Sequence, residues 1–175
     1  MKNKPLLIAI FYSVAYIIAT LYFYYSERYA LFNIVYLLSM ALILPLVILT
    51  VKIQRDAFGG YISGKSAVRE GMKFVLYSVF ILVVFQCAFY FAGWREFKTE
   101  SLPIYIREKA LELDKLGKRK FDEKQLQQVI VEETKNITLF KELTFVFFRC
   151  IFVGLFSSFL TAALMKRSKP ANTRH

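Results

Sequence analysis

The sequence lacks the residues that most catalytic and metal-binding sites require. Its single histidine, His175, lies at the C-terminal end, so no histidine is placed beside a nucleophile or in a ligand cluster. The two cysteines, Cys87 and Cys150, both fall within apolar runs, which excludes a disulfide framework, a zinc site and a redox pair. No glycine-rich phosphate loop occurs either. We therefore expect no catalytic residue, no bound metal and no cofactor, and a protein that is not an enzyme.

Acidic residues are also few, with 13 Asp and Glu against 24 Lys and Arg and a net charge of +11. Such an excess can indicate nucleic-acid binding, but the position of the charges argues against it. Residues 94–142 hold eleven basic and ten acidic residues, so this segment is nearly neutral. The excess lies in short segments beside apolar runs, which is typical of membrane topology. We expect no nucleic-acid partner.

Apolar residues are abundant, at 57% of the chain, and 17% of the residues are aromatic. Soluble domains average about 45–50% apolar residues, and a chain this short has little interior in which to bury more. Four apolar runs, each about as long as a membrane-spanning helix, occupy residues 5–25, 31–51, 74–93 and 144–165. The sequence predicts an all-α fold with one membrane domain over residues 1–175, built as an integral membrane four-helix bundle.

The basic residues also predict an orientation. They gather before the first run, between the second and third, and after the fourth, and four spans place these three segments on one side. Because Lys and Arg are enriched on the cytoplasmic side, both termini are expected in the cytoplasm. The expected location is the bacterial inner membrane.

The cytoplasmic connection between the second and third runs contains a local helix signal. Gly59 and Gly60 interrupt the chain, and a short basic helix is expected over residues 63–73. Its basic side chains would face anionic headgroups, so the lipid bilayer is the expected partner of this segment. These side chains are Lys65, Arg69 and Lys73.

The charged segment between the third and fourth runs predicts a helical hairpin over about residues 102–140, outside the cytoplasm. Pro103 suits a first helical turn, and Asp122 is a plausible N-cap for the second helix. The pattern allows the second helix to continue into the fourth run, or to kink at 136–138. Whether the hairpin packs on the bundle or projects from it is left open.

These features together resemble the domain of unknown function 4199 family, small four-span membrane proteins of Bacteroidota. The most specific piece is the segment GGYISGKSAVREGMKF, residues 59–74. The resemblance also covers the first pair of spans, the charged outer hairpin and a final span rich in small residues. It implies the topology and the inner-membrane location, and it implies no activity, ligand or catalytic residue.

Arg149 is the only ionisable residue inside the four runs, and such residues are candidates for function. Counted from the outer ends of the third and fourth runs, Gln86, Cys87, Arg149 and Cys150 lie at one depth. We predict that these two spans pack directly, with this polar layer in contact and a hydrogen bond between Gln86 and Arg149. Arg149 either extends to the outer headgroups, makes a structural hydrogen bond, or takes part in gating or anion handling.

Small residues recur every four positions in the fourth run, at Gly154, Ser158 and Ala162. This spacing lets another backbone approach closely. The partner is either another helix of the same bundle or a second copy of the chain.

Three functions remain open at this stage. The preferred one is a non-enzymatic structural or interaction subunit of the inner membrane, with an unknown membrane-protein partner. The alternative is a small transporter or channel that forms its pathway as an oligomer, with Arg149 near the outer mouth. The third is a lipid-modifying enzyme at the outer surface, which would use Glu108 and Glu112, one helical turn apart, as acid and base.

Overall fold

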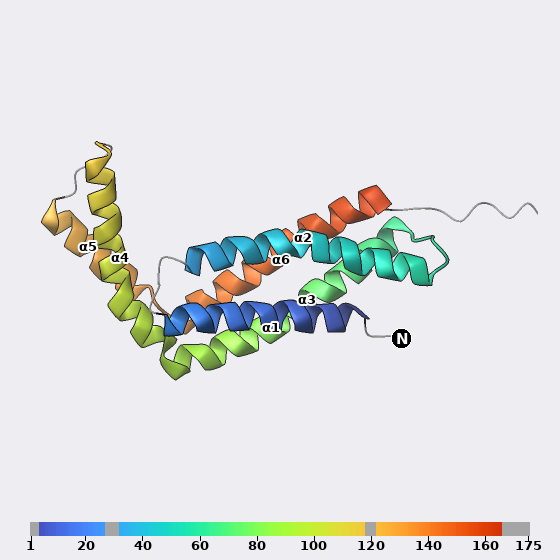
Figure 1. The fold of residues 1–175 in the computed structure, drawn as a ribbon, viewed down its shortest axis with the longest axis horizontal. Coiled ribbons are helices and arrows are strands. Elements are labelled where there is room, and N and C mark those ends of the chain that lie inside the picture. Colours follow the sequence, from blue (N-terminus) through green and yellow to red (C-terminus); the bar gives the residue numbers. More distant parts are fainter. Residues whose placement is uncertain (1–3, 27–31, 118–121, 166–175) are drawn as a thin grey trace, which may run out of the picture.

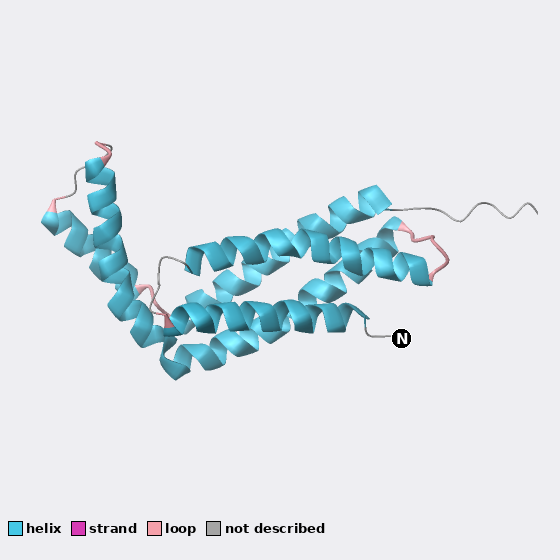
Figure 2. Ribbon diagram, in the orientation of Figure 1, coloured by secondary structure: helices cyan, strands magenta, loops and turns pink. Residues whose placement is uncertain are grey.

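Four long apolar helices run side by side in the computed structural model, and a helical hairpin lies at one end of them (Figure 1). The structure describes residues 4–26, 32–117 and 122–165, and nearly all of these are helical (Figure 2). The all-α fold class is therefore confirmed. The elements are α1 (Lys4–Tyr25), α2 (Phe32–Ala57), α3 (Gly64–Phe89), the π-helical turn η2 (Tyr90–Trp94), α4 (Arg95–Lys115), α5 (Glu123–Lys135) and α6 (Leu139–Met165).

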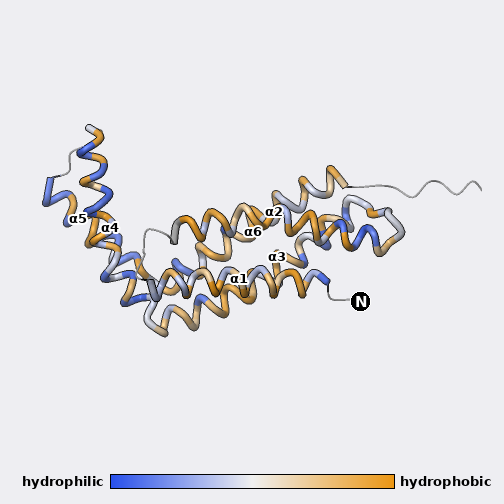
Figure 3. The backbone as a smooth tube through the Cα atoms, viewed as in Figure 1, coloured by the Kyte–Doolittle hydropathy of each residue, from blue (hydrophilic) through white to orange (hydrophobic). Residues whose placement is uncertain are grey.

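Most residues of α1, α2, α3 and α6 are apolar, as Figure 3 shows by colour, and many of their large apolar side chains are exposed. Phe80, Phe152 and Phe156 are each at least 70% exposed. A contiguous apolar surface of this kind is unfavourable in water and is expected where lipid is the solvent. All four bundle helices are long and apolar enough to cross a membrane.

Close contact between α3 and α6 organises the bundle interior. A Cβ atom added to Gly154 of α6 would lie 2.4 Å from a methyl group of Val75, and one added to Gly71 of α3 would lie 2.6 Å from the Ser158 hydroxyl. Each helix thus places a glycine where the other helix needs space. Small residues allow two backbones to approach, and dispersion contacts then hold them together.

The connection between α2 and α3 turns at Gly59 and Gly60, whose φ angles of 73° and 85° favour glycine. Ser63 then caps α3, because its hydroxyl accepts a hydrogen bond from the Ser66 amide. The structure differs here from the expectation of a separate basic helix over 63–73. This segment is the first part of α3, because Ala67 and Gly71 are buried in the bundle and hold it in line with the span.

A π-helical turn separates the third span from the hairpin. Gly93 has a φ of 125°, and the chain bends there without ending the helix. The hairpin therefore begins at Arg95 and not near residue 102 as expected. Pro103 lies within α4 and not in its first turn, because the bend at Gly93 restarts the helix two turns earlier than the sequence pattern suggested.

The hairpin consists of α4 and α5, which pack chiefly on each other. Figure 1 shows the pair running steeply across the axis of the bundle, at its end. Residues 136–138 form a break between α5 and α6, so the second hairpin helix is not continuous with the fourth span. Ile137 is buried in this break, which attaches the hairpin to the bundle.

Candidate functional site

Two adjoining groups of polar and aromatic residues occupy the end of the bundle that carries the hairpin. The first group centres on Glu142, near the start of α6, which is 8% exposed. Lys98 of α4 donates to it at 2.5 Å, and the indole nitrogen of Trp94 donates to its other oxygen at 3.4 Å. The Lys98 ammonium also lies 5.4 Å from the centre of the Trp94 ring. Because η2, α4 and α6 each supply one member, this cluster fixes the angle between hairpin and bundle.

A second tie joins the hairpin break to the bundle. The Tyr90 hydroxyl donates to the Ile137 carbonyl at 3.2 Å. Phe89, Tyr90, Trp94 and Ile137 form a small buried cluster that is distinct from the main core. The junction thus has its own apolar core as well as its ion pair.

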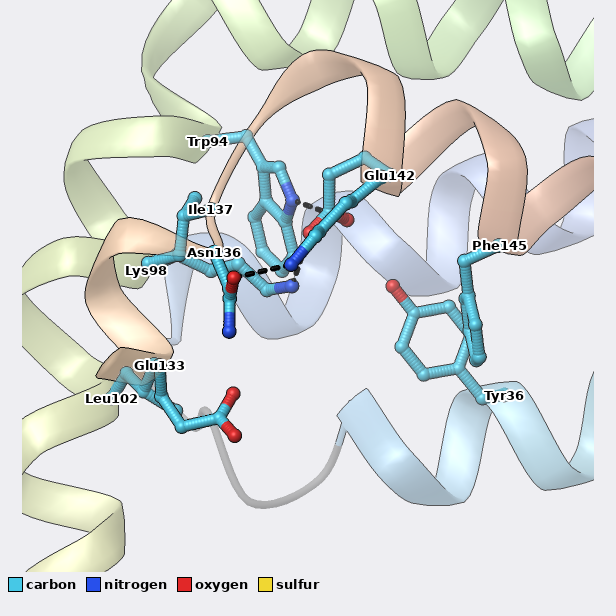
Figure 4. A pocket seen from close by; sticks show the side chains of 10 residues that line it. Tyr36, Trp94, Lys98, Leu102, Glu133, Asn136, Ile137, Glu142 and Phe145 are labelled. Atoms are coloured by element: carbon cyan, nitrogen blue, oxygen red, sulfur yellow. Dashed lines mark hydrogen bonds and ion pairs between the residues drawn. The ribbon is translucent and has the colours of Figure 1, made fainter. Parts of the chain in front are cut away.

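A cavity of about 410 Å³ opens between the hairpin and the bundle. Figure 4 shows Trp94, Lys98 and Glu142 on its wall, Glu133 and Asn136 at one side, and Tyr36 with Phe145 at the other. Lys141 completes the lining and donates to the Asn136 side chain. Both charge signs line the cavity, because it lies between the charged hairpin and the end of the apolar bundle.

Arg149 lies behind the Tyr36 and Phe145 wall, one helical turn beyond Phe145 on α6. Its guanidinium carbon is 4.6 Å from the centre of the Tyr36 ring, 5.5 Å from that of Tyr16 and 5.6 Å from that of Phe145. The residue is 6% exposed. Three helices thus form an aromatic cage around a permanently charged group.

The comparisons with known proteins give a family and no more. The family model described as "Protein of unknown function (DUF4199)" matches residues 6–167. The chain belongs to this family. No curated protein and no solved structure matches this DUF4199 protein, so the site has to be interpreted from its own geometry.

Arg149 of this DUF4199 protein is buried and does not extend to the surface at the hairpin end of the bundle, which corrects the expectation that it reaches the headgroups. All three guanidinium nitrogens are buried, and none makes a hydrogen bond of normal geometry to the described residues. The expected bond to Gln86 is therefore not formed, because it would need one of these nitrogens to donate to the Gln86 carbonyl oxygen. The surrounding rings hold the side chain inward.

The other members of the expected polar layer are placed differently from one another. Gln86 is 2% exposed and Cys150 is 1% exposed, whereas Cys87 is only partly buried. Cys87 follows Gln86 by one residue, a rotation of about 100° around a helix, and cannot share its face. Both cysteines are free thiols. The expected direct packing of the third and fourth runs is present, as α3 against α6. Contact between Gln86 and the Arg149 and Cys150 pair stays a prediction, and Cys87 lies on a different face.

The small residues of the fourth run face the interior of this chain. Gly154 packs against Val75, Ser158 is fully buried beside Gly71, and Ala162 is 6% exposed. Of the two partners left open, the structure places another helix of the same bundle against this face. A second copy of the chain cannot reach it without displacing α3.

The three basic residues expected at the headgroups lie on the exposed side of α3. Arg69 and Lys73 both pair with Glu70, at 3.5 Å and 2.8 Å, and Glu70 itself is 4% exposed. Lys65 is exposed beyond the bundle. Contact of these residues with anionic lipid stays a prediction.

Sequence reasoning missed the residues that define the two groups. Glu142 was counted with the solvent-exposed charges of the hairpin, although its place at the start of an apolar run was a signal of burial. Tyr16 and Tyr36 were counted among many aromatic residues of the spans. Nothing in one sequence shows that rings from α1 and α2 meet a side chain of α6.

Proposed function

We propose that this protein is a non-enzymatic, multi-pass protein of the bacterial inner membrane that binds another protein through its outer hairpin. In this arrangement both termini lie in the cytoplasm. The distribution of basic residues supports the orientation, because residues 52–73, from the end of α2 to the first part of α3, carry five Lys or Arg against two acidic residues. The hairpin, with both signs nearly balanced, then lies on the outer side.

The observation that carries the proposal is the exposed apolar surface of α4. None of its residues is buried. Ile104 and Leu111 of this helix are 62% and 61% exposed, and Leu116, directly after it, is 60% exposed. These side chains lie on the hairpin, beyond the apolar bundle, and in the proposed arrangement lipid tails would not cover them. Large apolar groups exposed on an ordered element mark an interaction site.

The charges around these residues favour a protein partner. Helices that bind a lipid surface carry mostly basic residues on the polar face, whereas the hairpin alternates both signs. Arg107 pairs with Glu123 at 3.5 Å, and Lys109 pairs with Glu112 at 2.6 Å. A mixed pattern of this kind gives register and specificity against another protein surface.

The outer-surface enzyme has less support. Glu108 and Glu112 would need to act as acid and base, yet the Lys109 ammonium beside Glu112 holds the pKa of that carboxyl below its usual range. A carboxyl that stays ionised is a poor general acid. Both residues are also fully open to solvent on α4.

A photo-crosslinking amino acid placed at Ile104 or Leu111 tests the partner proposal in living cells. We expect a discrete heterologous protein adduct from these two positions. The matched control is Phe152, equally exposed but on the apolar bundle, which should give adducts with lipid only. The proposal fails if the hairpin positions give the same products as Phe152, or only adducts between copies of this chain.

Transport is tested separately by ion and solute flux in proteoliposomes. We expect no flux above that of empty vesicles, because four helices are few to enclose a pathway and the four apolar runs contain no acidic residue to bind a cation. Flux that disappears on substitution of Arg149 would replace our proposal with the transporter.

A further inference from the structure

Arg149 is a buried cation whose guanidinium nitrogens make no hydrogen bond of normal geometry within the described residues. Arginine stays charged inside proteins, and removing an ion from water costs several kcal/mol unless a counter-charge or acceptors compensate. The aromatic cage compensates in part, because the rings of Tyr16, Tyr36 and Phe145 attract the flat face of the guanidinium. The rings themselves do not accept N–H bonds at the guanidinium edge. The Tyr16 hydroxyl interacts with the guanidinium, but one hydroxyl cannot satisfy five N–H donors, so most of them still require an acceptor.

The neighbouring polar groups add no negative charge. Ser13 and Thr20 lie on the same face of α1 as Tyr16, one turn before and one turn after it, and their hydroxyls also have no hydrogen bond of normal geometry. Glu142 is already held by Lys98 and Trp94. Tyr16 and Cys150 interact with the guanidinium electrostatically, yet both are neutral groups at ordinary pH. The chain therefore offers a net positive, donor-rich interior.

The geometry points to Arg149 and its aromatic cage as a binding site for one carboxylate. A carboxylate carries a single negative charge, which balances one guanidinium and leaves the buried site neutral. Its two oxygens match two parallel N–H donors of arginine. It is also a terminal group, and so enters a narrow cage end-on, whereas a phosphodiester is substituted on both sides.

The junction cavity supplies a route to this site. Tyr36 and Phe145 line the cavity on one face and contact Arg149 on the other. Phe145 is 51% exposed, so rotation of its ring away from Tyr36 meets little packed structure.

The carboxylate belongs either to an amphiphile such as a fatty acid or to a small soluble acid. The test uses the full chain in nanodiscs of zwitterionic phospholipid, with oleate, oleyl alcohol and acetate as probes. Binding is followed by native mass spectrometry and by the thermal unfolding midpoint. We expect one oleate per chain with a raised midpoint, and no specific binding of oleyl alcohol, which has the same chain without the charge.

Two variants of Arg149 identify the site. Arg149→Gln should bind oleate about ten- to a hundredfold more weakly, the effect of losing hydrogen bonds to a charged group. Arg149→Lys keeps the charge and the fold but loses the paired donors, and should bind with intermediate affinity. Arg107→Gln, the same change on the exposed hairpin, should bind as the wild type does.

Each outcome decides the proposal. Binding of oleate alone assigns the site to an amphiphile, and binding of acetate as well, lost in the same variants, assigns it to carboxylates in general. Equal binding of oleate and oleyl alcohol would overturn it, as would unchanged oleate binding in both Arg149 variants. Absence of carboxylate binding to the folded wild type would also overturn the proposal, and would mean that water alone solvates Arg149. Because no hairpin residue is changed in the Arg149 variants, the result is independent of partner binding.

Discussion

At the scale of single residues, the two buried charges near the hairpin, Glu142 and Arg149, have different surroundings. Glu142 is neutralised by Lys98 and accepts a second bond from Trp94. Arg149 has aromatic neighbours and no counter-ion among the described residues. The ion pair of Glu142 therefore holds the junction together, whereas the N–H donors of Arg149 remain able to bind a ligand.

Glu142→Gln should destabilise the junction. The change leaves Lys98, whose side chain is only 19% exposed, without its counter-charge. Loss of a hydrogen bond to a charged group costs about 1.5–3 kcal/mol. The measurement is the unfolding free energy in detergent, together with the fluorescence of Trp94, the only tryptophan in the chain.

Glu112→Gln is the matched control, because its pair with Lys109 has a similar distance of 2.6 Å but lies in solvent. Exposed pairs contribute little, so the unfolding free energy should hardly change. The lowered pKa of Glu112 makes its small contribution present at neutral pH and lost as the pH falls through that lowered value. Equal effects of the two substitutions would refute the role assigned to Glu142.

Gly154→Leu should destabilise the bundle itself. The leucine side chain would occupy the position of the Val75 methyl groups, 2.4 Å from its Cβ atom. Overpacking of this kind costs about 1–3 kcal/mol. The same change at Ala163, which is exposed on α6, should have little effect on thermal unfolding. A stable variant with altered oligomeric mass would instead place the Gly154 face between copies of the chain.

At the scale of elements, the four spans could be predicted because length and hydropathy alone define them. The hairpin bounds could not, because Gly93 ends an apolar run and also looks like a helix end. The structure shows that the chain bends at Gly93 with a φ of 125°, and that the Tyr24 hydroxyl would lie 2.6 Å from an added Cβ atom, so this position requires glycine. The basic segment before the third span was expected as a separate helix, since sequence periodicity does not reveal that Ala67 and Gly71 pack on other helices.

Gly93→Ala should therefore loosen the hairpin. Alanine is strained at a φ of 125°, and its methyl group would meet the Tyr24 hydroxyl, at a cost of about 1–3 kcal/mol. Trp94 is 1% exposed, so its emission should shift to longer wavelength as the junction opens. Gly60→Ala has a similar positive φ with no atom nearby, and should leave Trp94 emission unchanged. Unchanged emission in Gly93→Ala as well would show that the bend does not depend on this glycine.

At the scale of the whole molecule, an apolar bundle and a charged hairpin are held together by the junction around Glu142 and Ile137. Composition was enough to predict the bundle, because a chain this apolar has too little interior of its own. The Arg149 cage was beyond sequence reasoning, since it depends on how α1, α2 and α6 come together. The proposed function requires in addition that the hairpin lies outside the cytoplasm.

Cysteine labelling tests that requirement most directly. Lys109→Cys on the hairpin and Lys65→Cys at the start of α3 are each placed in a background in which Cys87 and Cys150 are alanine. Both positions are exposed in the structure, so reactivity with a membrane-impermeant maleimide reports only the side of the membrane. In intact spheroplasts we predict labelling of Lys109→Cys, and labelling of Lys65→Cys only after permeabilisation. The reverse pattern would place the hairpin in the cytoplasm and contradict the account.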